Sequence, residues 1–159
     1  MSGGMRRISP ALLFLAPLLA LATAPPVLAQ RAAAAGPQRI GTFGNWTAAT
    51  HTENGGKICY AFTRAQRSEG GGARQNVLLT VTHRPQGRDQ VSVALGYALP
   101  RGADNNVEAA VGDRELPFYA AGANAFAQNN AATVAAFRNG RDAVVKGPGT
   151  GGRGGTTDT

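Results

Sequence analysis

Two runs of alternating apolar and polar residues, joined by a short polar connector, constrain the fold of this chain more than any other feature. They occupy residues 77–99, with the sequence VLLTVTHRPQGRDQVSVALGYAL. Apolar side chains recur at every second position, and this period places them on one face of a β-strand. Pro85 cannot donate to a strand ladder and Gly87 permits a positive φ, so the chain is expected to reverse within residues 84–90. The pattern predicts an antiparallel strand pair with one apolar face.

Further strands are expected on both sides of this pair. Residues 107–111 and 114–119 form a second hairpin, because the Gly-Asp connection between them suits a primed turn. One helix is expected over residues 131–138, where Val134 and Phe137 share a face; Asn129 or Asn130 caps it and Gly140 ends it. The remaining expected strands are residues 41–48, 57–63, 124–128 and 142–146. The fold predicted is mostly β: an antiparallel β-sandwich-like or partly open barrel domain with one short helix near the C-terminus.

The first 29 residues are typical of a secretory signal peptide. Two arginines precede an apolar run over residues 8–24, and small residues end the segment before Gln30. A transmembrane anchor is the alternative, but the run is short and contains two prolines. No cysteine follows the run, which excludes a bacterial lipoprotein anchor. We therefore expect an exported protein, in the periplasm or on the outer surface of a Gram-negative bacterium.

The rest of the chain is expected to divide into three parts. Residues 30–39 are low in complexity and are predicted to be a flexible lead-in, and residues 40–147 form the β domain. Residues 148–159 are a Gly/Thr-rich tail that contains GPGTGG, a formal match to the spaced glycines of dinucleotide-binding loops. That motif needs a helix N-terminus directed at the pyrophosphate, and no helix-forming residues follow here. The tail therefore predicts a flexible loop and no cofactor site.

Basic residues are the most informative candidates for a site. The net charge is +7 for the whole chain, and removal of residues 1–29 takes away two arginines and no acid, leaving +5. An antiparallel meander alternates the ends at which its loops emerge, so the arginines gather at loop tips. The candidate anion-contacting residues are Arg64, Arg67, Arg74 and Arg101 at one end, and Arg84 and Arg88 at the other, with Lys57 beside them.

These tips favour an anionic envelope partner: lipopolysaccharide, anionic lipid or acidic polysaccharide. A solvated basic surface without a partner is the alternative. Nucleic acid is not expected, because the protein is exported and lacks aromatic residues interleaved with the basic ones.

No catalytic, cofactor-binding or metal-binding residue is predicted. The two histidines, His51 and His83, stand in no nucleophile motif. An alternative to a binding protein is a small periplasmic hydrolase that uses His83 with a serine or acid supplied by the fold. Cys59 is the only cysteine, so no intramolecular disulfide is possible, and its apolar strand predicts a buried, inert thiol; a reactive or dimer-forming thiol is the alternative.

Several segments, taken together, resemble the invasion-associated locus B family of bacterial envelope proteins. They are FGNWTA (43–48), KICYAF (57–62), VTHRP (81–85), QVSVALGY (90–97), and AVVKG with TTDT near the end. The resemblance implies an exported, β-rich, non-enzymatic domain associated with host-cell invasion or attachment in pathogens, and it carries over no catalytic residue.

The chain differs from this family at its end. Family members continue past TTDT into a further strand, so the resemblance predicts a sheet edge left uncovered at residues 142–146. Unpaired backbone groups on such an edge favour self-association.

Overall fold

The computed structural model describes residues 36–102 and 106–159, so the expected signal peptide lies outside the described residues. Eleven antiparallel strands in the described residues form one sheet that is not closed into a barrel. In sheet order they are β1 (Gln38–Phe43), β2 (Trp46–Glu53), β3 (Gly56–Arg64), β5 (Leu78–Arg84), β6 (Gly87–Ala94), β9 (Asn124–Ala127), β8 (Arg114–Ala121), β7 (Val107–Val111), β10 (Val144–Pro148), β11 (Gly155–Asp158) and β4 (Ser68–Glu69). One helix, α1 (Asn130–Asn139), and a 3₁₀ turn, Thr150–Gly152, complete this part of the chain. The predicted fold class is confirmed.

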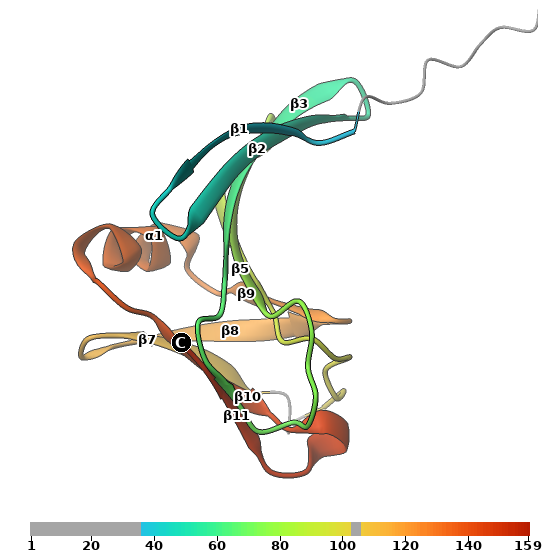
Figure 1. Ribbon diagram of the computed structural model, residues 1–159, viewed down its shortest axis with the longest axis vertical. Helices are drawn as coiled ribbons and strands as arrows, with labels where there is room; N and C mark the ends of the chain where they lie inside the picture. The colour runs from blue at the N-terminus through green and yellow to red at the C-terminus, as the bar shows by residue number, and fades with distance from the viewer. Residues whose placement is uncertain (1–35, 103–105) are drawn as a thin grey trace, which may run out of the picture. The chain divides into compact units, whose positions relative to one another are not determined.

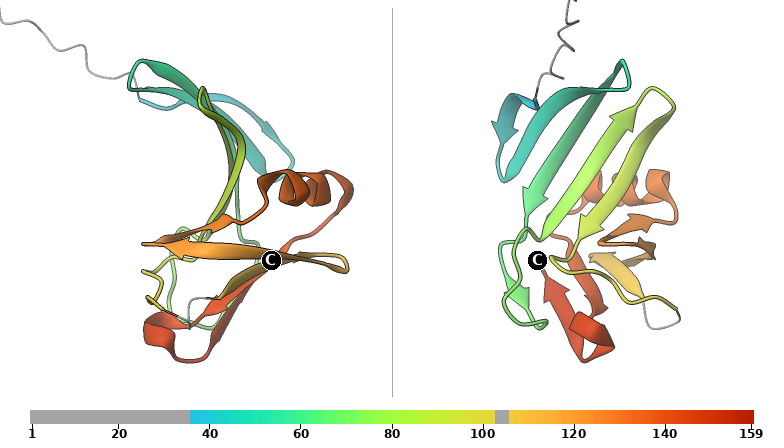
Figure 2. Two further views of the ribbon diagram at one scale, coloured as in Figure 1. Left: turned by 180° about the vertical axis from the view of Figure 1, so that it is seen from behind. Right: turned by 90° about the vertical axis from the view of Figure 1, so that its right-hand side faces the viewer.

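The sheet curls strongly along its width. Figure 1 shows β7 and β8 running across the direction of β5, with α1 on the inner side of the curl. The view from behind in Figure 2 shows the same arrangement. The inner face of the sheet therefore packs partly against itself and partly against the helix.

The central strand pair forms as predicted. β5 and β6 are antiparallel neighbours, with Val81 opposite Val91 and Leu79 opposite Val93. The second hairpin also forms, since β7 and β8 are joined through Gly112, whose φ of 58° is the left-handed conformation that the turn requires. The helix begins and ends within one residue of its predicted bounds, and the Asn129 side chain accepts a hydrogen bond from Ala132 N.

The segment expected to be a single strand over residues 41–48 is a hairpin. β1 ends at Phe43 and β2 begins at Trp46, and the two strands pair in antiparallel register. Gly44 between them has a φ of 59°, which a side-chain-bearing residue adopts at a cost. β1 begins at Gln38, two residues before the expected start of the domain.

The C-terminal tail is ordered, and the edge expected at residues 142–146 is paired on both sides. β10 lies between β7 and β11, with Val145 opposite both Ala109 and Asp158. Both predictions, the flexible tail and the uncovered edge there, are wrong. The glycines that suggested a loop instead make the turn between β10 and β11, where Gly149 N donates to Gly154 O at 2.9 Å.

The hydrophobic core is assembled from β5 through β10 and the helix. Its buried members are Leu79, Val91, Val93, Leu95, Leu99, Val107, Ala109, Val111, Leu116, Phe118, Ala125, Ala127, Ala136 and Val145. β1, β2 and β3 contribute no fully buried residue to this cluster, and Trp46 only borders it. The inner face of β2 and β3 is therefore covered less completely than the rest of the sheet. Within the described residues, no helix is long and apolar enough to cross a membrane.

Candidate binding groove

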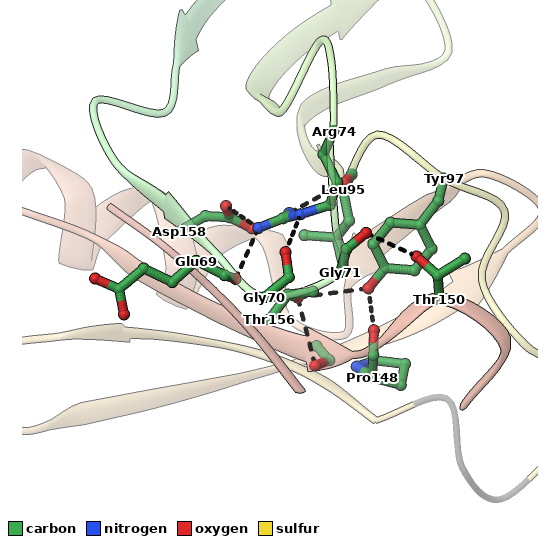
Figure 3. A network of polar contacts seen from close by, with 11 residues as sticks. Glu69, Gly70, Gly71, Arg74, Leu95, Tyr97, Pro148, Thr150, Thr156 and Asp158 are labelled. Atoms are coloured by element: carbon green, nitrogen blue, oxygen red, sulfur yellow. Dashed lines mark hydrogen bonds and ion pairs between the residues drawn. The ribbon is translucent and has the colours of Figure 1, made fainter. Parts of the chain in front are cut away.

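Arg74 is buried and is not the exposed loop-tip residue that the sequence predicts. Its side chain is 2% exposed and that of Asp158 is 3% exposed. Arg74 Nη1 and Nη2 each donate to one carboxylate oxygen of Asp158 at 2.8 Å. Its other three N–H groups donate to the carbonyl oxygens of Gly70, Leu95 and Glu69 (Figure 3). All five guanidinium donors are thereby engaged, so Arg74 has none left for an external anion.

The loop around Arg74, residues 65–77, which we term the strap, is fixed to the end of the chain. Besides the ion pair, Gln66 N and Arg67 N donate to Thr159 O at 2.6 and 3.2 Å, and Thr159 N donates to Arg67 O at 3.0 Å. Composition alone suggests a mobile loop here because the strap is polar and rich in glycine. Its contacts with β11 instead give it a fixed path, at the side of the sheet where Arg64 ends β3.

The other five candidate arginines separate to the two ends of the strands, as the meander argument requires. Arg64 lies opposite Leu78 at one end of the strands. The strap and the loop that carries Arg101 emerge from the sheet at the same end. Arg84 and Arg88 lie at the β5–β6 turn at the opposite end. The structure therefore does not bring the predicted site residues together in one cluster.

Two of these five arginines have partners on the protein. Arg64 Nη1 donates to Asn76 Oδ1 at 3.0 Å. Arg84 donates to Gln90 Oε1, and its Nε is 3.7 Å from Glu53 Oε2. The side chains of the remaining three make no hydrogen bond or ion pair with residues that the structure describes; these are Arg67, Arg88 and Arg101. Their charge is available to solvent or to a partner.

A shallow groove runs along the inner face of β2, β3 and β5, facing α1. Its floor follows from the register, which lines up Ala48, Ala61 and Val81 in one cross-strand row. Side chains in such a row share one face of the sheet. Since two of the three are alanines, the row does not fill the space between the sheet and the helix, and all three residues line the resulting hollow.

The wall of the groove is one face of α1. Val134 and Phe137 are half-buried, as expected for residues that share a face, and both pack against the core and line the groove. The same face of the helix is fixed to the sheet: Thr133 is 1% exposed, and Asn130 Oδ1 accepts a hydrogen bond from Val91 N at 2.9 Å. This attachment holds the helix at a set distance from the groove floor.

The groove consists of two hollows that share Trp46 and Phe137 in their walls. The hollow nearer Arg64 has a volume of about 170 Å³, and the one nearer His83 about 440 Å³. The volume of the larger hollow falls in the range typical of small-molecule sites, about 300–1,000 Å³. The walls are predominantly apolar, with Arg138 lining one hollow and Arg141 the other.

His83 lies in the groove with a carboxylate beside it. Its Nε2 is 2.7 Å from Asp89 Oδ1, and both side chains are roughly one-third exposed. Cys59 is the cross-strand neighbour of His83 and is half-buried, so the thiol is less enclosed than predicted; its Sγ lies 3.9 Å from Thr50 Oγ1. A hydrolase would need both a carboxylate and a hydroxyl within hydrogen-bond reach of His83. The described residues supply the carboxylate but no hydroxyl partner for the imidazole.

Sequence reasoning missed Arg138 and Arg141 as groove residues. A signal was present for Arg138, because it lies four positions after Val134 and so one turn along the same side of the helix, but Arg141 lies beyond Gly140, where the helix has ended. As the basic residue in the last turn of the helix, Arg138 also interacts favourably with the helix dipole. What the sequence does not show is that this face opposes a row of alanines on β2 and β3.

Neither the placement of metal-ligating side chains nor comparison with known proteins assigns a further property to the site. The described residues contain no group of three or more His, Cys, Asp or Glu side chains placed to hold a metal ion. Comparison of the chain with protein-family models, with curated proteins and with solved structures finds no match. The candidate site is therefore defined by its geometry alone.

Proposed function

We propose that this chain is an exported, non-enzymatic protein of the bacterial envelope that binds an anionic envelope component. The proposal rests on the predicted signal peptide, on the resemblance to the invasion-associated locus B family, and on the basic surface of the domain. The partners that this chemistry favours are lipopolysaccharide, anionic lipid and acidic polysaccharide. In an invasive organism such binding would support attachment to host cells.

One observation carries the proposal: exposed, unpaired arginines lie beside an open apolar groove. Arg138 and Arg141 are exposed, line the groove, and make no hydrogen bond or ion pair with any described residue. Exposed basic groups next to apolar surface are the arrangement expected for a partner with both anionic and apolar parts.

Binding across a salt series tests this function. The protein purified from the periplasm of an expressing bacterium is mixed with lipopolysaccharide, and separately with vesicles of phosphatidylglycerol or of phosphatidylcholine, and bound protein is measured by sedimentation. We expect binding to the anionic materials that weakens as salt rises, because exposed charges are screened within roughly 10 Å at 0.1 M salt. Equal binding to both vesicle types, or none to any material, contradicts the proposal.

Export is tested on the same material. We expect the protein in the periplasmic or extracellular fraction, with Gln30 as its first residue after cleavage at the predicted site. Uncleaved protein in the cytoplasm contradicts this part of the proposal.

The second candidate function is a small periplasmic hydrolase. The observation that favours it is the His83–Asp89 hydrogen bond in the groove, since a carboxylate that orients a histidine is part of most catalytic triads. Ester substrates with chromogenic leaving groups provide the assay. Hydrolysis that is lost in both the His83→Ala and the Asp89→Asn variants supports an enzyme, whereas hydrolysis unchanged by either variant excludes this site as its source.

A further inference from the structure

The groove has the properties of a site for a slim apolar chain. Its floor is the row of Ala48, Ala61 and Val81, and its wall is Val134 and Phe137 of α1. Small side chains on the floor and large ones on the wall leave a channel that follows the strands. From Arg64 to Cys59 along β3 the channel extends about 17 Å, at roughly 3.3 Å per residue.

The floor offers almost no hydrogen-bonding groups to an occupant. β3 is paired with β2 on one side and with β5 on the other, so its backbone N–H and C=O groups are engaged within the sheet. A peptide strand or a sugar lying on this floor would lose hydrogen bonds to water without replacing them, at about 1–3 kcal/mol for each unsatisfied group. A hydrocarbon chain has no such groups and gains from burial at roughly 25 cal/mol per Å².

The charges at the groove favour an anionic head group on that chain. Arg138 and Arg141 line its two hollows, and Arg64 also lines the smaller hollow. Arg74 balances the charge of Asp158, whereas Asp89 is hydrogen-bonded to His83, which carries a charge only when protonated. Asp142 also lines the smaller hollow, and no acid among the described residues forms an ion pair with Arg138 or Arg141, so both guanidinium groups are free to meet an anion.

We infer that the groove binds one acyl chain of an anionic phospholipid, with the head group held by Arg138 and Arg141. This inference deepens the proposed function and rests on it, since it names the lipid as the anionic partner and the groove as its site. The chain lies along the alanine row, under Phe137 and beside Trp46. Charge complementarity selects the head group, and the apolar channel holds a single chain.

Trp46 provides a direct measure of occupancy. It is the only tryptophan of the chain, and it lines both hollows of the groove. The probes are lysophosphatidylglycerol and lysophosphatidylcholine of equal acyl length, each titrated below its micelle concentration into the periplasm-purified protein. We expect a saturable blue shift of Trp46 emission, with the anionic lipid binding at least about tenfold more tightly, a difference of about 1.4 kcal/mol. No saturable change with either lipid overturns the inference.

Two sets of variants locate the site. Ala61→Phe fills the floor and is expected to abolish the titration while far-ultraviolet circular dichroism and melting stay close to those of the parent. The Arg138→Gln/Arg141→Gln double variant should reduce the preference for the anionic lipid to near unity without preventing chain binding. Arg114→Gln/Arg153→Gln is the matched control, since it removes the same charge from exposed positions that do not line the groove. An equal effect of the two double variants overturns the assignment of the head-group site.

Vesicle binding distinguishes a failure of this inference from a failure of the proposed function on which it rests. If Ala61→Phe is folded and still sediments with phosphatidylglycerol vesicles as the parent does, the groove is not the lipid site, but the envelope-binding proposal stands. If the parent binds neither lipopolysaccharide nor anionic vesicles, both fail. Loss of lysolipid and vesicle binding together in Ala61→Phe supports both.

Discussion

The strap and the groove both use arginine, and they use it in opposite ways. In the strap, Arg74 is buried, its five donors are engaged, and Asp158 balances its charge. In the groove, Arg138 and Arg141 are exposed and have no partner among the described residues. Arginine in a glycine-rich loop therefore gives no indication of an anion site until the position of the nearest carboxylate is known.

The same contrast holds for the apolar surface of the two regions. Around the strap, Leu95 is fully buried and Tyr97 donates a hydrogen bond to Pro148 O (Figure 3). In the groove, Trp46 and Phe137 remain half-buried with space beside them. The Arg74 side chain is enclosed by its partners, whereas the groove, whose smaller hollow the strap also lines, leaves room for an additional molecule. We expect substitutions in the strap to change the stability of the fold, and substitutions of the exposed arginines in the groove to change ligand binding.

The largest effect is expected for Asp158→Asn. The change leaves the Arg74 guanidinium buried without its counter-charge, and breaking one side of a buried ion pair costs about 3–5 kcal/mol. Urea denaturation followed by circular dichroism measures the loss. Asp113→Asn, at an exposed turn, is the control and should change stability by less than about 0.5 kcal/mol. A loss below about 1 kcal/mol in Asp158→Asn would mean that the strap is not held by this pair.

Gly70→Ala should be nearly as damaging. Gly70 has a φ of 75°, and a Cβ there would lie 2.1 Å from Gly155 O of β11. The left-handed conformation costs an alanine roughly 1–2 kcal/mol, and the clash adds about 1–3 kcal/mol. Gly122→Ala is the matched control: its φ is 67° and a Cβ there meets nothing within 4 Å. Equal melting temperatures of these two variants would contradict the close packing of the strap on β11.

Asn130→Ala tests the attachment of the groove wall. The change removes the acceptor of the Val91 N–H, a donor on a residue with no exposed surface, and an unsatisfied buried donor costs about 1–3 kcal/mol. Asn139→Ala, near the other end of the helix and exposed, should be close to neutral. Hydrogen exchange of α1 amides provides a second readout, since release of the helix accelerates their exchange. Unchanged exchange in Asn130→Ala would show that packing alone fixes the helix.

The smallest effect is expected for Arg84→Ala. Arg84 is partly exposed and lies 3.7 Å from Glu53, and exposed ion pairs of this kind contribute about 0–1 kcal/mol. Thermal melting at low and high salt measures it. A loss comparable to that of Asp158→Asn would remove the distinction between the two classes of arginine.

The core of the fold was predictable because its signals are local. Alternation across residues 77–99 specified β5 and β6, the Gly-Asp pair specified the second hairpin, and Asn129 with Gly140 marked the ends of the helix. The C-terminal segment was not predictable in this way. Thr156 and Asp158 carry the polar side chains of an apparent tail, and they are buried only because the strap supplies Arg74 to one and Tyr97 lies beside the other.

The sequence alone determined the central strand pair, the second hairpin, the helix and the ends at which the loops emerge, because period, turn chemistry and capping act over a few residues. Only the tertiary structure decided which arginine is buried and which is free, since Arg74 and Asp158 are 84 positions apart in the chain. The groove is likewise a product of the tertiary structure. A row of small residues becomes a channel only when the register aligns Ala48 with Ala61 and when the hydrogen bond from Val91 to Asn130 holds the helix above them.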